Sequence, residues 1–145
     1  MNLRPNVALI VIDGAGKILI GERTDIAGAW QLPQGGIDTG EEAETAAWRE
    51  LAEETGLTPA EVTLAGKSGP FSYRLPNGAV VARGFAGQEQ TYFLFRLTAP
   101  TATLRPNDEF RAFRWEEPAA VLALAVDFKR PCYAAAFREL FGETR

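Results

Sequence analysis

Runs of apolar and β-branched residues, separated by short polar turns, predict where the strands of this chain lie. The run 7–12 is continuously apolar and predicts a buried strand. The turn sequence DGAGK follows it, and the segment 18–23 after the turn predicts the second strand of a hairpin. Further segments with an extended pattern are 30–32, 62–73, 79–83, 90–97 and 110–115.

One segment has both the length and the end signals of a helix. It runs from about 40 to 55, and Thr39 with Glu42 three residues later has the spacing of a capping box at its start. Gly56 is a favourable residue just beyond its end. The glycine-rich segment 34–40 before it predicts a loop.

Two further helices are predicted near the C-terminus. Pro118 can begin a short helix, and Asp127 can cap a last helix that reaches Leu140. The order of strands, helix, strands and helix predicts an α/β fold in which helices pack against a mixed sheet.

Length and composition indicate a single domain spanning 1–145 that needs no disulfide or structural metal to fold. The one cysteine, Cys132, permits no internal disulfide, which suits a reducing compartment. The longest apolar run, 119–126, is too short to cross a bilayer, and no signal peptide is recognised at the N-terminus. We therefore expect a cytoplasmic protein without a membrane partner.

The charge balance and the lack of histidine narrow the possible chemistry. A net charge of −4 disfavours binding along an extended nucleic-acid backbone, although a single phosphate-rich end could still be bound. With no histidine in the chain, Ser-His and Cys-His nucleophiles and His-ligated zinc are excluded. A carboxylate is then the expected general base.

The predicted helix 40–55 concentrates carboxylates on one face. At 100° per residue, Glu50, Glu53 and Glu54 share one sector. Three small residues lie in the same sector, Ala43, Ala46 and Ala47. Because a row of alanines lets a helix approach its neighbour closely, we expect this face to look inward or into a cleft.

Carboxylates that close together repel each other, and a cation between them would relieve the repulsion. Oxygen ligands without histidine or cysteine suit Mg²⁺ or Mn²⁺. A water on such a cation, beside a spare glutamate, could attack phosphorus. The alternative interpretation of the three glutamates alone is a solvated acidic helix, which is common.

The spacing around these glutamates resembles the Nudix box. Every specified position of that box is matched, by Gly35, Glu41, Arg49, Glu50, Leu51, Glu53, Glu54, Gly56 and Leu57. The resemblance implies a Nudix hydrolase, which is an α/β/α sandwich with a mixed β-sheet between helices and uses divalent cations.

By that resemblance, Glu50 and Glu54 would be metal ligands, and Glu53 would be a ligand or the general base. Arg49 would pair with a glutamate such as Glu41 and support the geometry of the loop and the helix. The backbone of Gln34 and the two glycines after it would help to hold roughly one to three ions.

The resemblance extends beyond the box to the branch of RNA pyrophosphohydrolases, which includes plant-type diadenosine tetraphosphate hydrolases. The segments that carry it are 4–13, 30–38, 87–95, 109–115 and 126–133. It implies a further metal ligand, Glu109, and substrate-binding roles for Arg4, Arg23, Gln88, Phe128 and Lys129. Arginine and lysine suit a polyphosphate, and Phe128 could stack on a base.

The implied activity is hydrolysis of 5′-triphosphorylated RNA ends or of dinucleoside polyphosphates such as diadenosine tetraphosphate. One alternative is a housecleaning hydrolase of damaged nucleoside triphosphates. Another is a non-catalytic Nudix-like module that senses a nucleotide. The module is disfavoured because it could lose carboxylates freely, whereas all of those expected are present.

Overall fold

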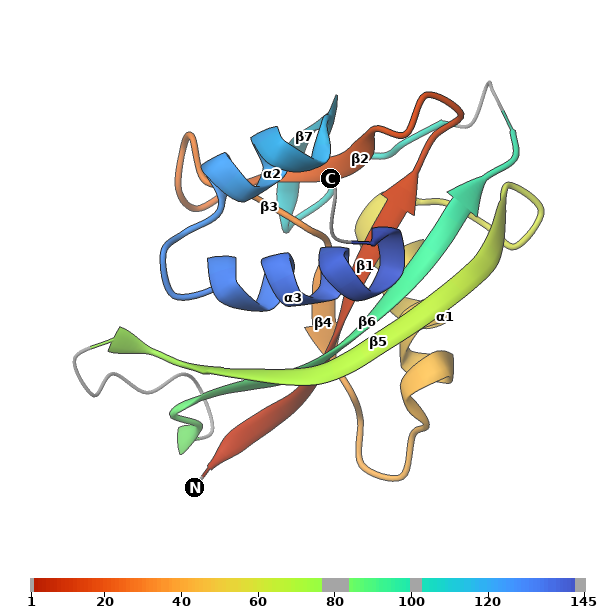
Figure 1. The fold of residues 1–145 in the computed structure, drawn as a ribbon. Coiled ribbons are helices and arrows are strands. Elements are labelled where there is room, and N and C mark those ends of the chain that lie inside the picture. The colour runs from red at the N-terminus through yellow and green to blue at the C-terminus, as the bar shows by residue number, and fades with distance from the viewer. Residues whose placement is uncertain (1, 77–83, 100–102, 143–145) are drawn as a thin grey trace.

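The computed structural model describes residues 2–76, 84–99 and 103–142, and a mixed sheet with helices on both faces dominates it (Figure 1). The strands are β1 (Leu3–Ile12), β2 (Ile18–Arg23), β3 (Trp30–Gln31), β4 (Gln34–Gly36), β5 (Val62–Arg74), β6 (Gly87–Leu97) and β7 (Phe110–Glu116). The helices are α1 (Ala43–Thr55), α2 (Pro118–Leu124) and α3 (Arg130–Phe141). The predicted strand 79–83 lies outside the described residues.

β1 is the centre of the sheet and has different neighbours along its two edges. Along one edge it pairs in parallel with β6, which is flanked in turn by β5. Along the other edge β1 pairs antiparallel first with β4, at residues 6–8, and then with β2, at Ile12. β2 carries β3 and β7. β4 therefore lies beside the N-terminal half of β1, and β2 pairs with β1 only at its C-terminal end.

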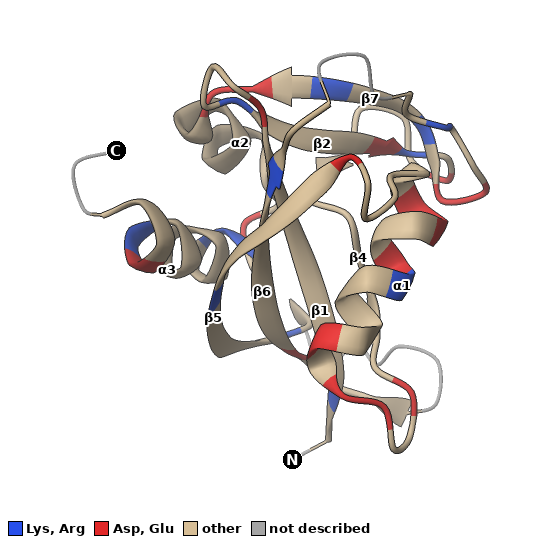
Figure 2. Ribbon diagram, turned by 90° about the vertical axis from the view of Figure 1, so that its right-hand side faces the viewer, with Lys and Arg blue, Asp and Glu red and all other residues tan. Residues whose placement is uncertain are grey.

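Alternate side chains of β1 enter two different cores. Val7, Leu9 and Val11 pack with α1, whereas Ala8 and Ile10 pack with α2 and α3. Both sets are fully buried, which is why the strand is continuously apolar. Figure 2 shows the sheet between α1 and α3. The predicted α/β/α sandwich with a mixed sheet is confirmed.

α1 ends as predicted but begins differently. Gly56 follows it with a φ of 82°, and its N–H donates to the carbonyl of Ala52. The predicted capping box of Thr39 and Glu42 is wrong, because the helix begins at Ala43 and Glu42 makes no side-chain cap. A turn from Asp38 to Glu41 intervenes and keeps Thr39 outside the helix.

The start of α3 and the glycine-rich segment also differ from the prediction. Asp127 does not cap α3, because its carboxylate accepts a hydrogen bond from the Arg130 side chain at 2.8 Å and the helix begins only at Arg130. The segment 34–36, predicted as a loop, is the strand β4, because its backbone pairs with β1. Among the described residues, no helix is long and apolar enough to cross a membrane.

Candidate active site

The site begins where β4 meets the glutamates of α1. A Cβ added to Gly35 would lie 1.9 Å from the carboxyl carbon of Glu50, so only glycine allows this approach. Glu50 is 7% exposed and Glu54 is 9% exposed. The prediction that this helix face looks inward is confirmed for these two residues, whereas the Glu53 side chain is 56% exposed. Figure 2 shows the acidic positions gathered on α1 and on the loop before it.

Arg49 connects this loop to the carboxylates of α1. Its Nε and Nη2 donate to the two carboxylate oxygens of Glu41 at 2.9 and 2.8 Å, and Nη2 also donates to the Gly36 carbonyl at 2.9 Å. Its Nη1 donates to Glu50 at 2.8 Å and to Glu53 at 3.4 Å. The hydrogen bonds from Arg49, helped by the Asp38 N–H, lower the pKa of Glu41 to about 2. The structure thus brings Arg49 and Glu41 together as the resemblance implied.

Glu54 makes no ion pair of this kind with any residue that the structure describes. Its Oε1 is buried and has no hydrogen-bond partner among the described residues. Burial raises the pKa of Glu54 to about 8, and the negative charges of Glu109, Glu50 and Glu53 add to the effect. Burial also raises the pKa of Glu50, but the Arg49 guanidinium opposes the shift. A cation beside Glu54 would therefore stabilise the ionised form of this carboxylate.

These observations fit a hard divalent cation. In the described part of the chain, no three acidic, histidine or cysteine side chains are gathered closely enough to form a finished metal site. The unsatisfied oxygen of Glu54 and a set of donors made only of oxygen suit Mg²⁺ or Mn²⁺. Glu50 and Glu54 are the buried carboxylates that could hold such an ion.

A pocket of about 530 Å³ collects most of the other predicted residues. Those that line it are Arg23, Gln34, Gln88, Glu109, Phe128 and Lys129. Tyr73 and Gln31 also line it and were not singled out from the sequence, since a tyrosine or glutamine on a strand gives no local signal of a site. Trp30 lines this pocket and also packs against the core on the side of α2 and α3.

Lys129 is the buried cation of this pocket. It is 7% exposed, and its Nζ donates to the side-chain oxygens of Gln31 and Gln34 at 3.3 Å each. The same oxygen of Gln34 accepts a hydrogen bond from Gln90 at 2.9 Å. Burial, with a smaller effect from Arg23, lowers the pKa of Lys129 to about 8. The Gln34 side-chain oxygen is thus bound by both Lys129 and Gln90 within the pocket.

Of the predicted substrate-binding side chains, Phe128 and Arg23 line the pocket and Arg4 does not. Phe128 packs against Tyr73, with ring centroids 5.4 Å apart. Arg23 lines the pocket but is held by both oxygens of Asp25, at 2.8 and 2.5 Å. Arg4 does not line the pocket, and its guanidinium lies against Gly36 instead. Arg4 therefore lies at the end of β4, where the loop to α1 begins.

Gly35→Ala is expected to weaken Mn²⁺ binding by about 10- to 100-fold, the range typical when the support of a metal ligand is removed. The added Cβ would push the Glu50 carboxylate out of its position. Isothermal titration of the purified protein with Mn²⁺ measures this. Gly14→Ala is the control, since a Cβ there meets nothing within 4 Å. Unchanged affinity in Gly35→Ala would exclude Glu50 from the metal site.

The fold and the site together define a class of protein, namely an α/β/α sandwich with a carboxylate-rich helix beside a cationic and aromatic pocket. The model of the NUDIX domain family matches residues 2–136, which is most of the chain. The chain belongs to the NUDIX domain family.

Similar proteins agree with this assignment. The chain is 41% identical over 145 residues to the RNA pyrophosphohydrolase of Rhodospirillum rubrum, covering 96% of this chain and 87% of that one. It is 40% identical to the RNA pyrophosphohydrolase of Gluconobacter oxydans, covering 94% and 85%. The solved C. elegans Ap4A hydrolase in a binary complex shares the fold, with a TM-score of 0.75 and 19% identity over 97% of this chain and all of that one.

Membership of the family and likeness to these relatives make this chain an enzyme that hydrolyses pyrophosphate bonds. The alternative of a non-catalytic module is thereby set aside. Nudix hydrolases generally need a divalent metal, in agreement with the carboxylates on α1.

Proposed function

We propose that this chain hydrolyses a phosphoric anhydride bond in 5′-triphosphorylated RNA ends or in dinucleoside polyphosphates, with RNA ends as the first choice. The observation that carries the proposal is the position of Glu109, which lines the pocket of Lys129 and Phe128 and also raises the pKa of Glu54. A site for a phosphorylated nucleotide therefore adjoins the carboxylates of α1. The relatives called RNA pyrophosphohydrolase, about 40% identical, support RNA as the first choice.

The proposed metal ligands are Glu50, Glu54, Glu109 and the Gln34 backbone, with Mg²⁺ or Mn²⁺ as roughly one to three ions. When bound, the cation supplies Lewis acidity at phosphorus and a water of lowered pKa. Glu53, which is exposed whereas Glu50 and Glu54 are buried, would accept a proton.

The positioning part of the proposal rests on Arg49 and Glu41. Their bidentate pair, together with the bond from Arg49 to the Gly36 carbonyl, fixes the loop against α1. Neither residue needs to touch the reacting atoms for this role.

On the substrate side, the pocket has the size and the polarity of a nucleotide site. Lys129 and Arg23 would bind phosphate or a base edge, and Phe128 with Tyr73 would stack against a base. Arg4 and Gln88 would contact the substrate from β1 and β6, where they are paired neighbours. The net charge of −4 disfavours binding along an extended nucleic acid, so the proposed RNA substrate is bound at its 5′ end.

One side-by-side assay with Mg²⁺ tests the substrate. Initial rates would be measured on a short 5′-triphosphorylated RNA, on diadenosine tetraphosphate and on an oxidised nucleoside triphosphate. We expect the RNA to be hydrolysed fastest. Faster turnover of the dinucleotide would make that compound the substrate, and a preference for the oxidised nucleotide would overturn the proposal in favour of a housecleaning role.

Lys129→Met is expected to raise KM about 10- to 100-fold, the value of a hydrogen bond to a charged group, with kcat little changed. Because the charged form of Lys129 is lost above pH 8, the KM of the parent enzyme should rise between pH 7 and pH 9. The KM of Lys129→Met should not depend on pH over that range. Lys67→Met is the control, since Lys67 is exposed on β5 outside the pocket. A KM in Lys129→Met equal to that of the control would remove Lys129 from substrate binding.

A further inference from the structure

The loop that carries Glu109 is anchored to the C-terminal end of α1. The last carbonyls of a helix have no partner within it and need donors from elsewhere. Here the Thr55 carbonyl accepts a hydrogen bond from the Arg105 N–H at 3.0 Å. The Glu54 carbonyl accepts one from the side chain of Asn107 at 2.7 Å. The backbone of Glu54, a proposed metal ligand, is thus hydrogen-bonded directly to the loop before β7.

Asn107 uses the full hydrogen-bonding capacity of its side chain at this junction. Besides the bond to Glu54, its Nδ2 donates to the Arg105 carbonyl at 3.1 Å. Its Oδ1 accepts hydrogen bonds from the N–H groups of Glu109 and Phe110, at 2.8 and 3.0 Å. A single side chain therefore joins the backbone of Glu54 to the backbone of Glu109.

Glu109 is also held from its other side. Its carbonyl accepts a hydrogen bond from the Thr24 N–H at 2.9 Å, and the Thr24 hydroxyl donates to the Asp108 carbonyl at 2.6 Å. Both backbone groups of Glu109 are therefore fixed, although its side chain is exposed. Asn107 thus holds the backbone of Glu109 beside the last turn of α1, which carries Glu54.

We infer that Asn107 is a positioning residue, which holds the carboxylate of Glu109 at the distance from Glu54 that lets both bind one divalent cation. The inference rests on the proposed function, in which Glu54 and Glu109 are metal ligands. In this inference Asn107 contacts neither metal nor substrate, and it acts through its hydrogen bonds to the backbones of Glu54 and Glu109. Supports of metal ligands of this kind typically change metal affinity by about 10- to 100-fold.

The test is Mn²⁺ affinity, measured by electron paramagnetic resonance of the free ion, in Asn107→Ala and Asn107→Ser. Both variants lose the bond to Glu54, whereas serine can still accept from the following N–H groups and preserve the turn. We expect both to bind Mn²⁺ about 10- to 100-fold more weakly. A high concentration of Mn²⁺ should restore their kcat. Normal affinity in Asn107→Ser would overturn the role of the connection to α1.

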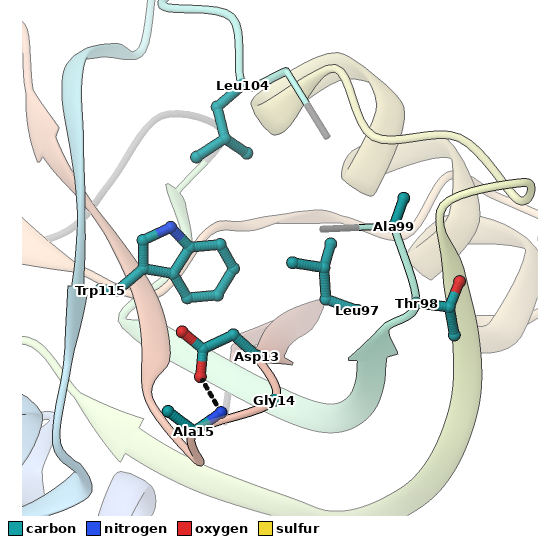
Figure 3. A pocket seen from close by; sticks show the side chains of 8 residues that line it. All are labelled: Asp13, Gly14, Ala15, Leu97, Thr98, Ala99, Leu104 and Trp115. Carbon is teal, nitrogen blue, oxygen red and sulfur yellow. Dashed lines mark hydrogen bonds between the residues drawn. The ribbon is translucent and has the colours of Figure 1, made fainter. Parts of the chain in front are cut away.

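Asp13→Ala is a matched control for loss of a turn. Asp13 also accepts hydrogen bonds from two backbone N–H groups, those of Ala15 and Lys17, each at 2.9 Å. Asp13 lines a different pocket, of about 350 Å³. Figure 3 shows that Leu97 and Trp115 line the same pocket. Asp13→Ala should lower the Tm of the metal-free protein about as much as Asn107→Ala does, with Mn²⁺ affinity unchanged. An equal loss of Mn²⁺ affinity in Asp13→Ala would mean that the effect of Asn107 is general destabilisation.

A double-mutant cycle with Glu109→Gln separates this inference from the proposed function. If Asn107 acts through Glu109, adding Asn107→Ala to Glu109→Gln should weaken Mn²⁺ binding no further. If Glu109→Gln alone leaves the affinity unchanged, the proposed metal role of Glu109 fails. If Glu109→Gln weakens binding and Asn107→Ala does not, the metal role stands and the positioning role of Asn107 is wrong.

Discussion

Glu53→Gln is expected to lower kcat by about 10²- to 10⁴-fold, the contribution of a positioned general base. The Glu53 side chain is 56% exposed and makes one long contact, 3.4 Å, with Arg49. Loss of the negative charge of Glu53 should therefore leave the fold intact, and the Tm of the metal-free protein should not change measurably. Glutamine keeps the shape of the side chain and removes the ability to accept a proton.

The measurement is the initial rate on 5′-triphosphorylated RNA at saturating Mg²⁺, together with Mn²⁺ affinity. If kcat falls and Mn²⁺ affinity is unchanged, Glu53 is the base, whereas a parallel loss of affinity makes it a ligand. Glu44→Gln is the control, because Glu44 is an exposed glutamate in the first turn of the same helix. Turnover in Glu53→Gln equal to that of the control would move the base to another carboxylate, such as Glu109.

The layers of the fold could be predicted from the sequence because each face of β1 leaves its own signal. A strand with apolar residues at every position from Val7 to Ile12 must be covered on both sides. The pairing of β1 with β4 could not be predicted. The segment 34–36 has no strand pattern, and its backbone becomes extended only because β1 lies beside it.

The predicted starts of α1 and α3 were wrong, and near each start an ion pair holds a carboxylate. Glu41, next to the expected box, is bound by Arg49 and fixes a turn that ends before Ala43. Asp127 is bound by the guanidinium of Arg130. Capping rules weigh a side chain against the backbone N–H groups of the helix, and they leave out an ion pair that competes for the same carboxylate.

The residues of the candidate site were also predictable from the sequence only in part. The spacing of Glu50 and Glu54 placed them on one helix face, and the structure buries both. Asn107 and Thr24 were missed, since each acts by a hydrogen bond to backbone 53 or 84 residues away. An asparagine or a threonine in a loop has the same local pattern whether it binds such a backbone or water.

Glu54→Gln is expected to have opposite effects on metal binding and on metal-free stability. Loss of a directly coordinating carboxylate should weaken Mn²⁺ binding at least as much as the about 10- to 100-fold typical of outer supports. In the metal-free protein the same change should stabilise the fold. It removes a charge whose Oε1 is buried and has no partner among the described residues.

The stabilisation should depend on pH in a definite direction. Burial raises the pKa of Glu54 from its ordinary value of 4.5 to about 8. Between these values the folded protein retains a proton that the unfolded chain has lost, so the free energy of unfolding of the parent falls as pH rises through this window. Glutamine is neutral throughout. The gain from Glu54→Gln should be near zero at pH 4.5 and reach on the order of 1–3 kcal/mol above pH 8, after allowance for solvent screening.

Thermal unfolding in EDTA across pH 4.5 to 9, and again with Mn²⁺, measures both effects. Each kcal/mol corresponds to a shift in Tm of about 2–4 °C for a chain of this size. In EDTA at pH 8 the Glu54→Gln variant should have the higher Tm. With Mn²⁺ the order should reverse, because a ligand that binds only the folded protein stabilises the parent by mass action and the variant much less. If the parent is the more stable protein in EDTA, Glu54 has a cationic partner without metal. If both gain equally from Mn²⁺, Glu54 is not a ligand. Only a metal-binding role for this buried carboxylate predicts that the variant has the higher Tm in EDTA and the parent the higher Tm with Mn²⁺.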